Sequence, residues 1–393
     1  MWDIREPEAY RLLADLIAID STNPSLVPGG AGEQKIAEFI ADYLKDAGFE
    51  SYLDQVQPGR PNVIGVMPAS EHSGVGRPGQ HGLIINGHTD TVSTAGMEYE
   101  PLVARRDGDA VHGRGSVDMK GGLVMALLAM LAVKRAGIRL RRSVLFTGVV
   151  DEEYASIGSE DVARRYKAGA AIITEPTGHG LTIAHKGFAW VSVESIGKAA
   201  HGSRYSEGID AIAKMGKVLV KVEDMGKAYL AEPEHPLCGY KSVHASLVEG
   251  GTELSTYPAY CKVQFERRTL PGEDPGEIAA ELEGICEALG REDPQFRARV
   301  TLDLTRNAYE VSKDEPIVAA IAAAYKEVMG QDVEYGGGSG WMDSALLGAA
   351  GIPTAIFGPG GRGGHSGKEW VSMQSILVGA EILARTIASL CGD

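Results

Sequence analysis

Cysteine is scarce in this chain, which has four among its 393 residues. They are Cys238, Cys261, Cys286 and Cys391, and none belongs to a Cys-x-x-Cys pair. This spacing excludes a disulfide framework and a cysteine-based zinc site. We therefore expect free thiols.

Basic residues are also in deficit, with 38 Lys and Arg against 53 Asp and Glu and a formal net charge of -15. An acidic surface repels nucleic-acid phosphates and anionic lipids, so we expect no nucleic-acid and no membrane partner. The N-terminal segment 1–13 lacks the basic and then apolar pattern of a signal peptide. The longest apolar run, 123–133, is too short to cross a bilayer and predicts a core helix. A cytoplasmic location follows as an expectation.

The order of predicted elements favours an α/β protein with two domains. Strands and helices alternate up to residue 183, which indicates a mostly parallel central sheet covered by helices. After residue 187 the order becomes strand, helix, strand, strand, helix, strand, as in a small α+β domain. We predict one domain from 1–186 and 306–393 and an inserted domain at 187–305. A glycine-rich stretch before residue 82 is expected to be a surface loop that carries His72 and His81.

The first predicted strand of interest, 83–85, leads into His88 and Asp90. Alternate side chains of an extended segment share one face, so the Asp90 carboxylate is expected to accept the second N–H of the His88 imidazole. Such a contact fixes the tautomer of a histidine that binds a metal. Asp118 follows in a bend rich in glycine, directly before the apolar helix.

Three other predicted strands end in the same kind of residue. Segment 143–150 leads to Glu152 and Glu153, segment 170–174 to Glu175, and segment 353–357 to His365. A lone histidine at a strand end is usually a structural or exposed residue. Ligands gather at the carboxyl ends of parallel strands, however, so we expect these side chains to converge.

Two imidazoles and three carboxylates suit a pair of divalent cations. If Asp118 bridges them, each metal would receive one histidine and one further carboxylate. Two close metals can hold a shared water as hydroxide and polarise a carbonyl oxygen. Glu152 would then be free to act as the general base.

These residues resemble the motifs of one family. The set is His88-x-Asp90, Gly113-x-Gly-x-x-Asp118, Asp151-Glu152-Glu153, Glu175-Pro176 and Gly358-Pro-Gly-Gly followed by His365. It is similar in order and spacing to the M20 metallopeptidases and amidohydrolases, the group of acetylornithine deacetylase, succinyl-diaminopimelate desuccinylase, aminoacylase and carboxypeptidase G. The resemblance implies that Asp90 is the orienting residue, that Glu152 is the base, and that the zinc ligands are His88, Asp118, Glu153, Glu175 and His365. We predict that His88 and Glu175 hold one metal, Glu153 and His365 the other, and Asp118 both. It also implies a cis peptide after Asp118.

The resemblance assigns roles to three further residues. His201 would stabilise the oxyanion from the partner subunit, and Arg268 would bind a substrate carboxylate. Asp343 matches an acidic position of the family and is a candidate for substrate binding. The alternatives are a surface histidine at 201 and a solvated charge at 268. The inserted domain would be a ferredoxin-like lid through which a homodimer forms.

The expected activity is cleavage of the amide bond of an N-acyl amino acid by metal-bound hydroxide, as in acetylornithine deacetylase. In the family, glutamate at position 175 is more typical of deacylases than of peptidases. Two zinc ions per subunit are expected, with cobalt or manganese as alternatives. A metal-dependent dipeptidase or carboxypeptidase acting on short peptides is the second hypothesis. A binding or regulatory protein that contains metal without catalysis is the third.

Overall fold

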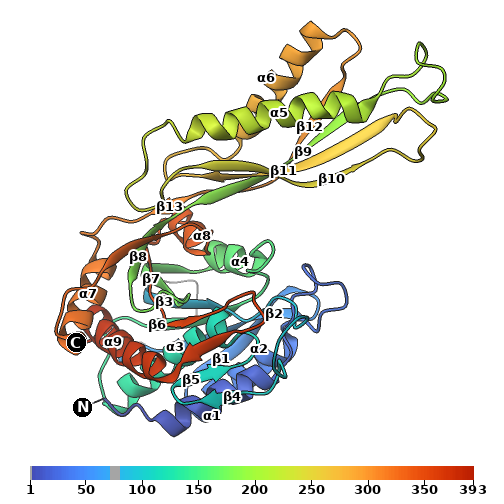
Figure 1. Ribbon diagram of the computed structural model, residues 1–393. Coiled ribbons are helices and arrows are strands. Elements are labelled where there is room, and N and C mark those ends of the chain that lie inside the picture. The colour runs from blue at the N-terminus through green and yellow to red at the C-terminus, as the bar shows by residue number, and fades with distance from the viewer. Residues whose placement is uncertain (1, 71–79) are drawn as a thin grey trace. The chain divides into compact units, whose positions relative to one another are not determined.

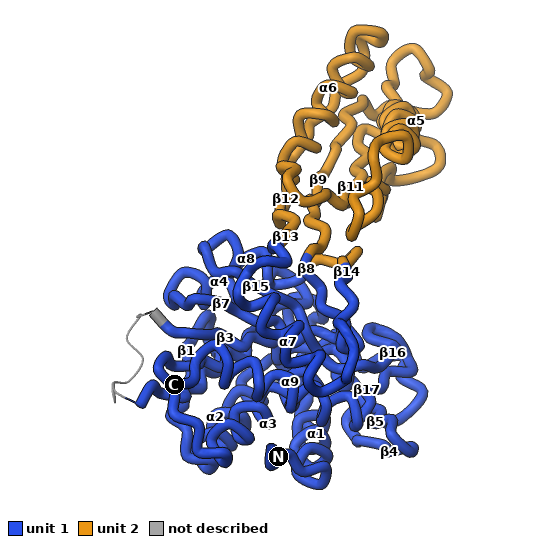
Figure 2. Tube along the Cα trace, turned by 90° about the vertical axis from the view of Figure 1, so that its left-hand side faces the viewer, with its two compact units in different colours: residues 1–183, 311–336, 342–393 blue, residues 184–310, 337–341 orange. Residues whose placement is uncertain are grey.

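The computed structural model describes residues 2–70 and 80–393, so the prediction for His72 lies outside the described residues. The chain forms two compact units, coloured separately in Figure 2. Unit 1 comprises residues 1–183, 311–336 and 342–393, and unit 2 comprises residues 184–310 and 337–341. The domain limits expected from the sequence, 187 and 305, stay a prediction.

The larger sheet has the strand order β1-β2-β6-β3-β7-β15-β8-β13, with β14 paired to β8. Its strands are β1 (Glu50–Gln57), β2 (Arg60–Met67), β3 (Gln80–His88), β6 (Val144–Val149), β7 (Lys167–Ile173), β8 (Leu181–His185), β13 (Tyr309–Glu310), β14 (Tyr335–Gly338) and β15 (Thr354–Ile356). The four strands from β6 to β15 are parallel, whereas β1, β2 and β8 pair antiparallel with their neighbours. The sheet is therefore mixed, which corrects the expectation of a mostly parallel one.

The correction has a local cause in the β1–β2 hairpin. Strand β1 is polar and partly exposed, so its sequence lacks the apolar run that marks the central strands. Gly59, in the turn between the two strands, has φ +75°, a conformation that glycine adopts without strain. The chain therefore reverses at once and adds two antiparallel strands to the edge of the sheet.

Helices cover both faces of this sheet (Figure 1). They are α1 (Glu6–Ala18), α2 (Gln34–Asp46), α3 (Gly121–Arg135), α4 (Ile157–Arg165), α7 (Pro316–Met329), α8 (Ser344–Ala349) and α9 (Met373–Cys391). One face buries Ile64 and Ile84 with residues of α4 and α8. Gly65 and Gly87 point to the other face, where α2 and α3 approach them so closely that a Cβ would clash. Successive side chains of each strand point to opposite faces, so the sheet packs against helices on both sides.

The predicted core helix at 123–133 is confirmed, because every residue of α3 from Gly121 to Val133 is buried. By length and composition alone, two helical stretches could cross a membrane, Ser116–Arg135 and Met373–Cys391. The most apolar window of the first is 94% buried within the protein, and that of the second 50%. A core helix passes the same test of length and apolarity.

A second sheet of unit 1 has the order β16-β17-β5-β4. Its strands are β4 (Arg105–Asp107), β5 (Ala110–His112), β16 (Gly361–Arg362) and β17 (Trp370–Ser372). The antiparallel pairing of β17 with β5 brings the loop between β16 and β17 beside the segment that leads to α3. That segment ends in a short helical turn, η1 (Ser116–Lys120), in which Asp118 has non-helical backbone angles.

Unit 2 has its own sheet of order β10-β11-β9-β12 and its own apolar core. In chain order its elements are β9 (Gly187–Ile196), α5 (Ala211–Tyr229), β10 (Ser242–Gly250), β11 (Tyr260–Thr269), α6 (Glu277–Glu292) and β12 (Ala298–Arg306). This is the element order predicted from the sequence. Both helices contribute to the core, Val218 from α5 and Leu282 from α6 among them, and pack against Val191 and Phe265 of the sheet.

The expectation that His81 lies in a surface loop is wrong. His81 belongs to β3 and is 6% exposed. Its Nδ1 forms a hydrogen bond with Oγ of Ser143, at 2.7 Å. Burial lowers the pKa of His81, so the folded chain favours the neutral imidazole there.

Candidate metal centre

The five candidate metal ligands of the sequence all lie in unit 1. His88 is the last residue of β3, Asp118 lies in η1, and the other three follow the ends of strands: Glu153 after β6, Glu175 after β7 and His365 after β16. They form two groups that share Asp118, and within each group the ligand atoms lie within 4.8 Å of one another.

The first group comprises His88, Asp118 and Glu175. Nε2 of His88 lies 3.1 Å from Oδ1 of Asp118 and 3.5 Å from Oε1 of Glu175. His88 is 1% exposed and Glu175 8%. These donor atoms therefore face one another in a space that is largely shielded from bulk solvent.

The second group comprises Asp118, Glu153 and His365. Nε2 of His365 lies 3.2 Å from Oδ2 of Asp118 and 2.9 Å from Oε2 of Glu153. Asp118 thus offers a different oxygen to each group. This grouping is the one expected from the sequence, while the roles of these residues as ligands stay a prediction.

The contact expected between His88 and Asp90 differs in detail. Nδ1 of His88 donates a hydrogen bond to the backbone carbonyl of Asp90 at 2.9 Å, and the nearest carboxylate oxygen is 3.6 Å away. The carboxylate instead accepts the backbone N–H groups of Glu152, at 3.2 Å, and Glu153, at 3.1 Å. The bond to the carbonyl occupies Nδ1, so Nε2 is the ring nitrogen of His88 that faces the site. Asp90 therefore orients both the histidine and the segment with two glutamates.

Sequence reasoning missed Glu369, which holds the backbone around Asp118. Glu369 is 1% exposed, and its carboxylate accepts hydrogen bonds from the backbone N–H groups of Gly115, Val117 and Asp118 at 3.0 to 3.1 Å. The guanidinium of Arg114 donates to it at 2.7 Å. Since 251 residues separate Glu369 from Asp118, no local motif of the sequence could have revealed this contact.

The backbone on both sides of the shared carboxylate is unusual. The peptide bond between Asp118 and Met119 is cis, as the family resemblance implied. Gly364 lies so near that a Cβ on it would be 3.0 Å from Oδ2 of Asp118. His365 has φ +62°, a left-handed conformation that is uncommon outside glycine. The loop before β17 thus approaches Asp118 in a shape that a bulkier residue at 364 would disturb.

The carboxylates of the site strongly affect one another. Burial raises the pKa of Glu175 to about 8 and, aided by neighbouring carboxylates, raises the pKa of Glu152 well above its ordinary value. Burial likewise raises the pKa of Glu153. For Asp118, burial is outweighed by hydrogen bonds from the two histidines, which lower its pKa. Negative charge is therefore crowded into a buried space, where a cation would relieve the repulsion.

The residues present fit divalent cations. Imidazole nitrogen and carboxylate oxygen are the donors that zinc accepts, and the two groups supply one histidine each. Oε1 of Glu153 is buried and has no hydrogen-bond partner among the described residues. An unpaired buried carboxylate oxygen is costly unless a ligand satisfies it.

Glu152 belongs to neither group, although it lies beside the first. Its Oε2 is 4.0 Å from Nε2 of His88, and its side chain is 12% exposed. A carboxylate in this position can reach a water molecule next to the donor atoms without itself completing a ligand set.

Neither of the two groups includes the three remaining candidates. Asp343 is 2% exposed and accepts a hydrogen bond from Oγ of Ser159 at 2.6 Å, and its expected role in substrate binding stays a prediction. His201 belongs to unit 2 and is exposed. Arg268, also in unit 2, forms an ion pair with Glu266 at 2.8 Å. The roles expected for His201 and Arg268 stay predictions.

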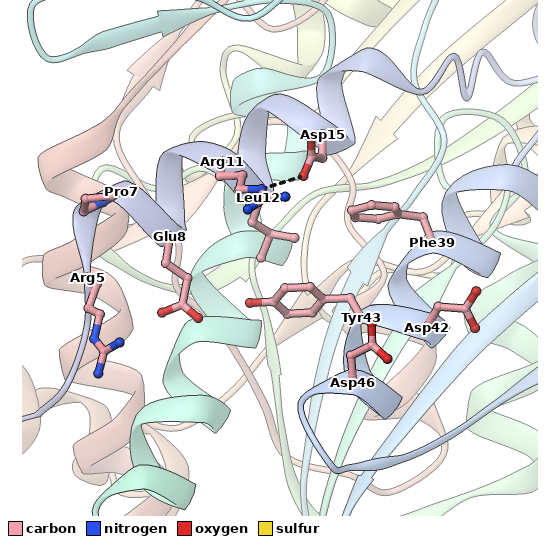
Figure 3. Close-up of a pocket in the computed structure, with 10 residues that line it drawn as sticks. All are labelled: Arg5, Pro7, Glu8, Arg11, Leu12, Asp15, Phe39, Asp42, Tyr43 and Asp46. Atoms are coloured by element: carbon pink, nitrogen blue, oxygen red, sulfur yellow. Dashed lines mark ion pairs between the residues drawn. The ribbon is translucent and has the colours of Figure 1, made fainter.

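An open groove of about 820 Å³ lies between α1 and α2 (Figure 3). Leu12, Phe39 and Tyr43 form its apolar part, and acidic residues such as Glu8 and Asp46 lie around them. Its lining residues include none of the candidate ligands. The groove is therefore separate from the metal centre.

Comparisons with known proteins agree with this geometry. The profile of Peptidase family M20/M25/M40 matches residues 84–389. Acetylornithine deacetylase of Myxococcus xanthus is 27% identical, over 98% of each chain. N-formyl-4-amino-5-aminomethyl-2-methylpyrimidine deformylase of Bacillus subtilis (strain 168) is 26% identical, over 93% of this chain and 91% of the relative. Among solved structures, aminopeptidase PepT from Bacillus cereus ATCC 10987 has a similar fold, with a TM-score of 0.78, 19% identity and coverage of 98% and 99%.

Proposed function

The chain belongs to peptidase family M20/M25/M40, whose members hydrolyse amide bonds with the help of metal ions, and we propose that it is a dizinc deacylase of N-acyl amino acids. The observation that carries the proposal is the position of Asp118, which turns one carboxylate oxygen to His88 and the other to His365. A carboxylate shared in this way suits two cations held side by side.

In this proposal His88, Asp118 and Glu175 hold one zinc ion, and Asp118, Glu153 and His365 hold the other. Bound divalent cations supply Lewis acidity, which polarises the scissile carbonyl and makes water a better nucleophile near neutral pH. The protein fixes the donors beforehand, because Asp90 orients His88 and Glu369 holds the backbone of Asp118.

Glu152 is the proposed general base. Its carboxylate takes the proton of the attacking water and delivers it to the departing amine nitrogen, so that the amide C–N bond breaks and a carboxylic acid and an amine leave.

Residues of unit 2 complete the proposal. His201 would donate a hydrogen bond to the oxyanion from a partner subunit, and Arg268 would bind the substrate carboxylate after exchanging its partner Glu266. We expect a homodimer formed through unit 2 and a cytoplasmic location.

The substrate class rests on the relatives. The two curated relatives are named for the removal of a formyl and of an acetyl group, which are small acyl groups. Glu175 agrees with this choice, because the family resemblance associates glutamate at this position with deacylases. A dipeptidase or carboxypeptidase is the alternative, favoured by the similar fold of an aminopeptidase. A metal-containing binding protein without catalysis would not need the carboxylate of Glu152 beside the ligand set.

A substrate panel tests the proposal. The purified protein, loaded with zinc, cobalt or manganese, is assayed for amine release from N-formyl and N-acetyl amino acids and from dipeptides. Turnover of the N-acyl compounds above the dipeptides is expected. The reverse preference would favour the peptidase, and bound metal without any turnover would favour the binding protein.

A further inference from the structure

We propose that Asn23 is a positioning residue that acts through Asp90 on the general base Glu152. This inference rests on the proposed function, because it concerns the geometry of the same hydrolytic site. Neither the motifs of the sequence nor the two ligand groups include Asn23. Its contacts nevertheless place it directly behind them.

Asn23 is completely buried and uses both ends of its amide. Nδ2 donates to Oδ2 of Asp90 at 2.7 Å and to Oδ1 of Asp151 at 3.2 Å. Oδ1 accepts the backbone N–H groups of Ser25, at 2.8 Å, and Leu26, at 3.3 Å. The backbone contacts fix which end of the amide faces the two carboxylates, because an oxygen there would repel them.

Asp90 transmits this position to the two glutamates. Its Oδ1 accepts the backbone N–H of Glu152 and its Oδ2 the backbone N–H of Glu153, so the carboxylate holds two successive peptide groups. Asp151, the residue before them, has φ +69°, a left-handed conformation that costs free energy in a residue other than glycine. Such a backbone conformation persists only when neighbouring groups stabilise it. Asn23 donates hydrogen bonds to the carboxylates of both Asp90 and Asp151, which stabilise this turn.

A buried arginine supports the same arrangement from the other side. Nη2 of Arg60 donates to Oδ1 of Asp151 at 2.8 Å and to Oδ1 of Asn23 at 3.3 Å. Nε of Arg60 donates to Glu33 at 2.9 Å, and Nη1 donates to Oγ of Ser25 at 2.7 Å. Arg60 therefore forms the ion pair with Asp151. Asn23, which is uncharged, connects this ion pair to Asp90 through its hydrogen bonds to both carboxylates.

This arrangement suits positioning better than simple stabilisation. Buried ion pairs contribute little net stability, because removing the charges from water offsets their attraction. Here the network of buried hydrogen bonds leads to the backbone N–H groups of Glu152, the proposed base, and Glu153, a proposed metal ligand. A displacement of about 1 Å at a reacting group can cost roughly a hundredfold in rate, so fixing these peptides has a direct effect on turnover.

Two measurements on Asn23→Ala test the inference. Hydrogen–deuterium exchange of the backbone amides in segment 150–158 measures how firmly this turn is fixed, and it needs no substrate. We expect the exchange rate of these amides to rise about tenfold in the variant. Turnover should fall about a hundredfold, with KM changed by less than about threefold. In the Asp90→Asn background Asn23→Ala should have little further effect on kcat, since residues that act in one chain are not additive.

Two variants serve as controls. Leu44→Ala opens a cavity on the buried face of α2 and lowers thermal stability without touching the network. Ser25→Ala removes a hydroxyl that Arg60 contacts but leaves the bond between Asn23 and Asp90 in place. Both should keep kcat within about threefold of the parent.

The outcomes distinguish a failure of the positioning role of Asn23 from a failure of the proposed function. Unchanged exchange in segment 150–158, or the same loss of kcat in Leu44→Ala as in Asn23→Ala, would overturn the positioning role. Full additivity with Asp90→Asn would overturn it too. A parent protein that releases no amine from any amide would instead refute the proposed function, while the exchange measurement would still decide whether Asn23 holds the turn.

Discussion

Nε2 of His365 lies 3.2 Å from Oδ2 of Asp118, while the other oxygen of that carboxylate faces His88. The two ligand groups are therefore joined through one side chain. A change at this carboxylate reaches both groups, whereas a change at any other ligand reaches one of them.

Metal content tests the shared carboxylate. We expect two zinc ions per chain in the parent protein by elemental analysis, and weaker binding at both sites in Asp118→Asn. The loss should exceed the roughly 10- to 100-fold that removal of an outer partner of a ligand costs. Glu98→Gln, which alters an exposed carboxylate paired with Lys368, should bind as the parent does. One zinc ion in the parent would contradict the arrangement.

The neighbouring residues Glu152 and Glu153 should respond differently to the same substitution. Glu152→Gln removes the proposed base, so kcat is expected to fall about 10²- to 10⁴-fold with the metal content unchanged. Glu153→Gln removes a ligand of the second group and should lower metal content as well as turnover. Turnover and elemental analysis of the two purified variants check this. Undiminished turnover of Glu152→Gln would remove Glu152 from the mechanism.

Gly364 gives a steric test of the same centre. Its substitution by alanine would place a Cβ 3.0 Å from Oδ2 of Asp118, so the carboxylate or the loop with His365 must shift. We expect metal affinity at the second group to fall by roughly tenfold or more, measured by competition with a chelating dye. Gly216→Ala, in α5 with open space around it, is the matched control and should bind metal normally. Equal affinities in both variants would contradict the close approach.

The stability of the protein should depend on pH through His185. Burial lowers the pKa of His185 to about 4, against an ordinary value of 6.5. Below pH 6.5 the unfolded chain gains a proton that the folded chain does not take up until about pH 4. The free energy of unfolding therefore falls as pH drops through this window, by about 3 kcal/mol in total from this residue.

Urea denaturation at several pH values between 7 and 4 measures this effect. His185→Asn keeps a donor for the carbonyl of Lys186, which Nδ1 of His185 contacts at 2.9 Å, but cannot titrate. Its stability should vary less with pH across the window than that of the parent. His244→Asn, at an exposed position, should follow the parent. If the free energy of unfolding depended on pH equally in His185→Asn and in the parent, His185 would not be the source of this pH dependence.

The sequence predicted the residues that meet at the metal centre because each follows a recognisable strand or precedes a recognisable helix. His88 ends an apolar run, and Glu175 ends another, so the rule that ligands gather at strand ends applied directly. The bridging position of Asp118 and the pairing of the other residues were hypotheses, and the structure groups the side chains in the same way.

The supporting residues could not be predicted in this way. Glu369 and Asn23 contact residues of the centre only because segments distant in the sequence pack against it. Neither residue belongs to a sequence motif that would predict these contacts. The carboxylate of Asp90 was assigned to the histidine on local spacing alone. The structure shows that it binds two peptide groups from a segment 62 and 63 residues away.

The mixed sheet was missed for a different reason. Alternation of strands and helices indicates parallel strands, but the polar strand β1 carries little apolar signal, so its hairpin with β2 escaped notice. His81 was predicted to lie in a loop because the sequence before it is rich in glycine, whereas in the structure β3 begins at Gln80.

The insertion of unit 2 into unit 1 has a consequence for biosynthesis. His88, Asp118 and Glu175 all precede the insertion, whereas His365 and the sheet strand β15 follow it. During translation the three donor residues of the first group therefore emerge before the insertion, whereas the second group lacks His365 until the segment after the insertion has been made. If each group holds an ion as proposed, the donors of the first ion are therefore synthesised before those of the second.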